Sequence, residues 1–113
     1  MMKFQKGNLF YLLSIFVAFC FLFSCAHSKI QLSENLQKGK LDYERGYYKE
    51  AFRELLPLAA DGKPEAEYAV GYMYYYGYGT PQDIDTGYFW IEKAANQHYQ
   101  PAVKALPMLG KKK

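Results

Sequence analysis

The chain has 113 residues, with 14 lysines and arginines, 11 aspartates and glutamates, and an aromatic content of 19% that includes 12 tyrosines. This length fits one small domain and excludes a multidomain enzyme, while the apolar fraction of 50% and the low net charge exclude a disordered chain. Once two lysines near the N-terminus and three at the C-terminus are set aside, nine of the 14 basic residues remain against 11 acidic ones. Because a nucleic-acid binder needs a basic face, this balance excludes nucleic acid as a partner.

Residues 1–24 have the pattern of a signal peptide. Lys3 and Lys6 precede the stretch 9–23, which contains no charge, glycine or proline. A positive segment followed by an apolar core of about 7–15 residues is typical of secretory signals. The uncharged stretch 7–27 just reaches the roughly 20 residues that a membrane-spanning helix needs, so an uncleaved anchor is the alternative. Both interpretations place the rest of the chain outside the cytoplasm.

The sequence Leu22-Phe23-Ser24-Cys25 resembles a bacterial lipobox. The resemblance implies that Cys25 is acylated and becomes the mature N-terminus, and two or three acyl chains suffice for stable membrane anchoring. Ala26 directly after the cysteine implies the periplasmic side of the outer membrane. Inner-membrane anchoring and simple secretion, with cleavage after Ser28, are the alternatives. Cys20 would leave with the signal, so the mature chain would contain no disulfide.

The remainder predicts an all-α domain. Residues 25–31 are interpreted as a lipidated tether, residues 32–109 as the helical domain and residues 110–113 as a basic tail. Apolar residues at helical intervals predict a first helix from Leu32, capped by Ser33 and Glu34 and broken at Gly46. The same pattern, with Gly and Pro at its breaks, predicts four further helices over residues 49–60, 65–76, 84–96 and 101–109. No segment has the pattern of a strand.

An internal repeat appears at an offset of 36 residues. Seven apolar positions match in this register: Phe52 with Tyr88, Leu55 with Ile91, Ala59 with Ala95, Ala66 with Ala102, Ala69 with Ala105, Val70 with Leu106, and Met73 with Leu109. Small alanines at such positions let helices approach closely. A repeating helix pair of this length predicts a short α-solenoid of antiparallel helix pairs, with about two repeats and a C-terminal helix.

Residues 66–83 and 90–95 resemble the Sel-one-like repeat (SLR) family, which is related to the tetratricopeptide repeat. The matching positions are Ala66, Val70, Gly71, Tyr74, Gly77, Gly79, Asp83, Trp90, Ala94 and Ala95. We expect Gly71 at a close helix contact, because glycine inside a helix costs about 1 kcal/mol relative to alanine. Gly77 and Gly79 are expected to supply positive φ in a tight loop. Tyr74 and Trp90 are expected to fill the space between paired helices.

Tyrosine is the residue type most suggestive of function. Residues 66–74 carry one apolar stripe, and Tyr68, Tyr72, Tyr75 and Tyr76 form a second stripe on the same predicted helix. In solenoids of this kind, as the resemblance implies, the first helix of each pair lines a concave groove that binds peptides. Tyr72, Tyr75, Tyr76 and Tyr78 are therefore the predicted contact surface for a protein or peptide partner. The alternative is that these rings pack against neighbouring helices.

No pattern predicts an enzyme, a cofactor or a metal site. His27 and His98 are isolated, Asp83 and Asp85 have the spacing of a helix cap, and no hydroxyl has a histidine–acid partnership. The leading hypothesis is a lipid-anchored adaptor of the bacterial cell envelope that binds a partner through its tyrosine-rich face. The alternatives are a self-associating repeat protein, hence a homo-oligomer, and a secreted SLR module involved in host interaction.

Overall fold

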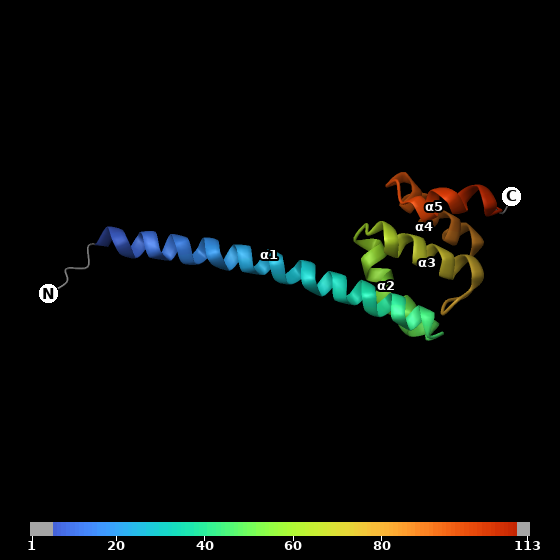
Figure 1. The fold of residues 1–113 in the computed structure, drawn as a ribbon, viewed down its shortest axis with the longest axis horizontal. Helices are drawn as coiled ribbons and strands as arrows, with labels where there is room; N and C mark the ends of the chain where they lie inside the picture. The colour runs from blue at the N-terminus through green and yellow to red at the C-terminus, as the bar shows by residue number, and fades with distance from the viewer. Residues whose placement is uncertain (1–5, 111–113) are drawn as a thin grey trace. The chain divides into compact units, whose positions relative to one another are not determined.

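The computed structural model describes residues 6–110, and every regular element in this range is helical. The elements are α1 (Lys6–Glu44), α2 (Tyr48–Ala60), α3 (Pro64–Tyr76), α4 (Ile84–Asn96), α5 (Gln100–Ala105) and the 3₁₀ helix η1 (Leu106–Met108) (Figure 1). The predicted all-α fold class is confirmed. The predicted basic tail lies outside the described residues apart from Gly110, as do the side chains of Lys6, Cys25 and His27.

The chain forms two compact units, one ending at Ser33 and one beginning at Glu34. In the first unit, the apolar side chains of α1 from Leu9 to Phe23 are exposed. The helix Gly7–Glu44 is long and apolar enough to cross a membrane, although a signal sequence near an N-terminus meets the same criteria.

The first helix begins much earlier than predicted. The expected tether 25–31 is helical, and Ser33 does not cap a helix: its Oγ donates a hydrogen bond to the carbonyl oxygen of Ile30, 2.7 Å away. The physical reason is that no glycine or proline occurs between Asn8 and Lys38, so nothing interrupts the backbone hydrogen bonds of the helix.

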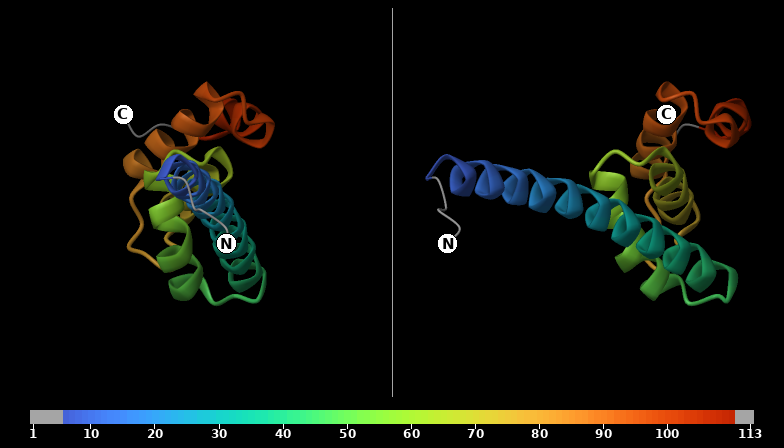
Figure 2. Two further views of the ribbon diagram at one scale, coloured as in Figure 1. Left: turned by 90° about the vertical axis from the view of Figure 1, so that its left-hand side faces the viewer. Right: turned by 60° about the vertical axis from the view of Figure 1, so that its left-hand side comes forward.

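In the second unit, α3 lies in the middle, with α2 on one side and α4 on the other (Figures 1 and 2). Leu55 of α2, Val70 and Met73 of α3, and Ile91 of α4 are fully buried between these helices. The short α5 packs on α4, where its Ala102 and Ala105 join Ile91 and Ala94 in one apolar cluster. The observed α4 has the predicted bounds, and α2 and α3 each begin one residue before the predicted position.

Positions that match in the 36-residue repeat are buried to a similar degree in the structure. All seven pairs of apolar positions are buried or half-buried, and in two pairs (Leu55 with Ile91, and Ala66 with Ala102) both side chains are fully buried. The second unit thus contains two helix pairs, the end of α1 with α2 and then α3 with α4, followed by α5, after which residues 106–110 contain no α-helix but only the short η1. This is the predicted solenoid of about two repeats and a C-terminal helix.

Gly71 of α3 and Gly87 of α4 face each other where these helices cross. A Cβ atom on Gly71 would lie 2.6 Å from Ile91 Cγ1 and 2.8 Å from the carbonyl oxygen of Gly87. A Cβ atom on Gly87 would lie 2.6 Å from the backbone nitrogen of Tyr75. The predicted close helix contact at Gly71 is confirmed, and it depends equally on Gly87, which the sequence analysis did not identify.

The loop between α3 and α4 uses glycine as predicted. Gly77 and Gly79 have φ angles of 75° and 72°, and Gly77 ends α3 in the left-handed conformation. The α-carbon of Gly79 approaches the carbonyl of Tyr48 so closely that no side chain would fit. This contact fixes the loop against the start of α2.

Candidate partner-binding site

Eight tyrosines of the second unit form one connected group of ring contacts, here called the tyrosine cluster: Tyr43, Tyr48, Tyr68, Tyr72, Tyr75, Tyr76, Tyr78 and Tyr99. Its centre is a ladder on α3, where Tyr68, Tyr72 and Tyr76 stand one helical turn apart with centroid distances of 6.1 and 4.5 Å. The ladder reaches α1 through Tyr78 and Tyr43, and the start of α5 through Tyr99.

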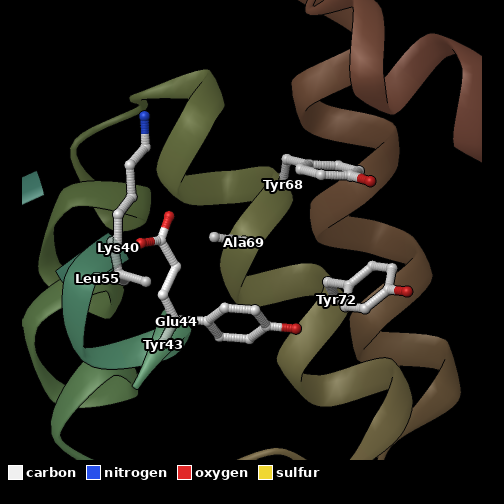
Figure 3. Close-up of a pocket in the computed structure, with 7 residues that line it drawn as sticks. All are labelled: Lys40, Tyr43, Glu44, Leu55, Tyr68, Ala69 and Tyr72. Carbon is white, nitrogen blue, oxygen red and sulfur yellow. The ribbon is translucent and has the colours of Figure 1, made fainter. Parts of the chain in front are cut away.

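A groove of about 370 Å³ lies beside this ladder, between the end of α1 and α3 (Figure 3). Its apolar lining comes from Leu55 and Ala69, and its aromatic lining from Tyr43, Tyr68 and Tyr72. Figure 3 shows the Tyr43 ring extending from α1 toward α3, with the rings of Tyr68 and Tyr72 one above the other on α3. Lys40 and Glu44 of α1 complete the lining and give the groove a charged side.

The four tyrosines predicted as the contact surface occupy different positions. Tyr72 lines the groove, and Tyr76, which is 43% exposed, continues the ladder. Tyr75 points elsewhere, because its hydroxyl donates a hydrogen bond to the carbonyl oxygen of Gly110 at 3.2 Å. Tyr78 stacks on Tyr48 at a centroid distance of 4.8 Å and so connects the α3–α4 loop to α2. Tyr72 and Tyr76 therefore remain the strongest candidates for partner contact.

Two further groove-side tyrosines were missed by the sequence analysis. Tyr43 lines the groove from α1, and Tyr48 packs against it at a centroid distance of 5.3 Å. A signal was available, because Tyr43, Tyr47 and Tyr48 lie together around the break at Gly46. Only the folded arrangement, however, brings this segment against Tyr78, which is 30 or more residues away along the chain.

The other predicted structural positions differ in their burial. Tyr74 packs edge-on against Phe52 of α2 at 5.2 Å, as expected of a residue between paired helices. Ala66, Val70 and Ala94 are fully buried. Trp90 is half-buried on α4 with the ammonium of Lys93 4.7 Å from its ring, and Ala95 is also half-buried. The fully buried large side chain of α4 is the neighbouring Ile91.

One buried acidic side chain was not identified from the sequence. Glu67 of α3 is fully buried, and its Oε2 accepts a hydrogen bond from Gln97 Nε2 at 2.8 Å. The second oxygen, Oε1, has no hydrogen bond, and Lys93 Nζ lies 3.4 Å from it. Gln97 also donates to the carbonyl oxygen of Gly62. This polar network joins α3, α4 and the loop before α3, which assigns Glu67 a structural role.

Asp83 acts as the predicted helix cap. Its side chain accepts hydrogen bonds from the backbone nitrogen and the hydroxyl of Thr86 at the start of α4. Across residues 6–110, no group of three or more His, Cys, Asp or Glu side chains is arranged to hold a metal ion.

Burial raises the pKa of tyrosines in the groove. The pKa of Tyr72 rises to about 12, first because of burial and second because of the neighbouring Tyr76 hydroxyl. Burial also raises the pKa of Tyr43 and of Tyr68. The rings that line the groove are therefore neutral phenols at physiological pH, able to donate hydrogen bonds through their hydroxyls.

This shift predicts loss of stability in alkali. Below pH 10 Tyr72 is protonated in both the folded and the unfolded chain, whereas between about pH 10 and 12 only the unfolded chain releases its proton. The free energy of unfolding should therefore fall as the pH rises through this range. Urea unfolding of the full chain in detergent, followed by circular dichroism at several pH values, measures the slope. Tyr72→Phe should reduce the slope, with Tyr47→Phe as the control at an exposed tyrosine. An unchanged slope in Tyr72→Phe would contradict the assignment.

Residues 64–99 match the model of the Sel1 repeat. The Sel1-like repeat covers α3, the loop with Gly77 and Gly79, and α4, and Sel1 repeats mediate protein–protein interactions. The chain is also 35% identical over 57 residues to the chitin synthase regulator SKT5 of Saccharomyces cerevisiae. That match covers 50% of this chain and 8% of the yeast protein. No solved structure matches the chain significantly.

Proposed function

We propose that this chain is a lipid-anchored adaptor of the bacterial cell envelope, which binds a protein or peptide partner through the groove and the adjoining ladder of Tyr68, Tyr72 and Tyr76. The observation that carries the proposal is the continuous tyrosine cluster beside a groove on a Sel1-like repeat. Tyrosine gives a large contact area with few rotatable bonds and a polar tip, and it is enriched at the energetic centres of interfaces.

The size of the groove favours a peptide over a flat protein surface. At about 370 Å³ it is near the lower end of the volumes found for small-ligand sites. Such a volume accommodates one or two side chains of an extended segment. The exposed part of Tyr76 would extend the contact along α3 beyond the groove.

The binding proposal predicts that two tyrosine substitutions weaken partner capture, whereas a control substitution outside the cluster does not. Tyr72→Ser and Tyr76→Ser should each weaken partner capture by a factor of about 30, the effect expected of an interface centre. Phe89→Ser is the matched control, because Phe89 is an exposed aromatic residue of α4 outside the tyrosine cluster. Capture from membranes of the source organism, quantified by mass spectrometry, measures the effect. Intact capture combined with a lower unfolding midpoint would show that these rings only pack the fold.

Anchoring is tested by the intact mass of the protein from the membrane fraction of its own cells. The proposal rests on the lipobox-like sequence that ends at Cys25 and on the apolar stretch that precedes it. The expected mass is that of residues 25–113 plus acyl groups. An unacylated mass starting after Ser28 would indicate a secreted module, and the full-length mass would indicate an anchor formed by the uncleaved helix.

Self-association is a second candidate, favoured by the end of the repeat array. At the 36-residue offset Val103 of α5 corresponds to Glu67 of α3, which is fully buried. Val103 is 41% exposed and Met108 is 79% exposed. End-to-end stacking would cover this surface. Sedimentation of the full chain in detergent tests it: a monomer at micromolar concentration would contradict stacking, and an oligomer dissociated by Val103→Asp would support it.

A further inference from the structure

The groove carries a negative charge that its own residues do not neutralise. Lys40 is already paired, because its Nζ lies 3.0 Å from Oε2 of Glu65. Glu44 is exposed at the end of α1 and, within the described part of the chain, its carboxylate has neither an ion pair nor a hydrogen bond. Because Lys40 and Glu65 neutralise each other, the carboxylate of Glu44 leaves one negative charge on this side of the groove.

Aromatic faces lie close to this charge. Figure 3 shows the carboxylate of Glu44 between Lys40 and Ala69, with the ring of the preceding Tyr43 extending from α1 toward the Tyr72 ring on α3. The face of a neutral aromatic ring attracts a cation, and this attraction is strongest where part of the surface is shielded from water. A carboxylate beside half-buried aromatic rings is therefore a complementary environment for a positive side chain.

We propose that the groove holds an arginine side chain from an extended segment of the partner, with the guanidinium against Tyr43 and Tyr72 and paired with Glu44. Arginine fits better than lysine, because its planar guanidinium stacks on rings and remains weakly hydrated. Its aliphatic stem would contact the half-buried Ala69. This inference rests on the proposed function, since it specifies the chemistry of the segment that the groove binds.

The test uses the full chain in neutral-detergent micelles and blocked pentapeptides Gly-Gly-X-Gly-Gly, in which X is arginine, lysine or citrulline. Citrulline has the shape of arginine without its charge. Titration followed by NMR of the tyrosine rings gives both the affinity and the location of binding. The arginine peptide should bind about three- to tenfold more tightly than the citrulline peptide, with the lysine peptide between them, and should shift the ring signals of Tyr43 and Tyr72.

Glu44→Gln should lower the ratio of the affinities for the arginine and citrulline peptides by at least about threefold, because the glutamine keeps the shape of the side chain without its charge. Glu92→Gln is the matched control, since Glu92 is an exposed glutamate of α4 outside the groove. Equal affinities for arginine and citrulline, unshifted Tyr43 and Tyr72 rings, or indifference to Glu44→Gln would each overturn the inference. If partner capture still depends on Tyr72 and Tyr76 in that case, the proposed function stands and only the arginine assignment fails.

Discussion

Gly71→Ala is expected to lower the free energy of unfolding by roughly 2–3 kcal/mol, despite the higher helix propensity of alanine. The new methyl group would meet the backbone of α4, with the carbonyl oxygen of Gly87 2.8 Å away and the nitrogen of Ile91 2.9 Å away. Backbone atoms cannot rotate aside, so α3 and α4 would have to separate where Gly71 and Gly87 bring them into close contact. Chemical denaturation of the full chain in detergent measures the loss.

Two controls separate crowding from other effects at Gly71. Gly46→Ala changes a glycine with φ of 82° and no atom within 4 Å of an added Cβ, so only a backbone cost of about 1–2 kcal/mol is expected. The double variant Gly71→Ala/Gly87→Ala should cost clearly less than the sum of the two single variants, because separating the helices once accommodates both methyl groups. Full additivity, or a Gly71→Ala variant as stable as the wild type, would contradict the close crossing.

Lys93→Met is expected to lower the free energy of unfolding by roughly 2 kcal/mol. The substitution keeps an unbranched apolar side chain near Trp90 but leaves the fully buried Glu67 without its counter-charge. Breaking a buried ion pair costs about 3–5 kcal/mol, and the expected value is smaller here because the Lys93 side chain is 40% exposed. Thermal or urea unfolding of the full chain measures the change.

A second substitution, at Glu67, makes this prediction specific. Adding Glu67→Gln to Lys93→Met removes the unpaired charge and should restore part of the lost stability, since the amide oxygen can still accept the hydrogen bond from Gln97. Lys104→Met, at an exposed lysine of α5, should change stability by less than about 0.5 kcal/mol. A Lys93→Met variant as stable as Lys104→Met would show that Glu67 does not need this cation.

The helices of the repeat could be predicted because local signals mark their ends. Gly62 and Pro64 separate α2 from α3, and Gly77 and Pro81 separate α3 from α4. The start of α1 could not be predicted from such signals, because the expected tether contains no helix-breaking residue. The fifth predicted helix is divided into α5 and η1, a difference that coincides with Pro107.

The site was predicted less completely than the fold. The ladder on α3 follows from helical spacing, so Tyr72 and Tyr76 were identifiable as neighbours. The contributions of Tyr43 and Glu44 depend on how the end of α1 meets α3, which is a long-range contact without a local pattern. For the same reason, the pairing of Gly71 with Gly87 and of Glu67 with Lys93 became visible only in the folded chain.

The central claim is that the tyrosine-rich face of α3 binds a protein partner, and photo-crosslinking in the source organism tests it most directly. A photoreactive phenylalanine analogue placed at Tyr76, which is 43% exposed, is compared with the same analogue at Phe89, which is 53% exposed on α4. The account predicts a discrete crosslinked protein from position 76 and none from position 89. No crosslink from position 76, or the same product from both positions, would contradict it.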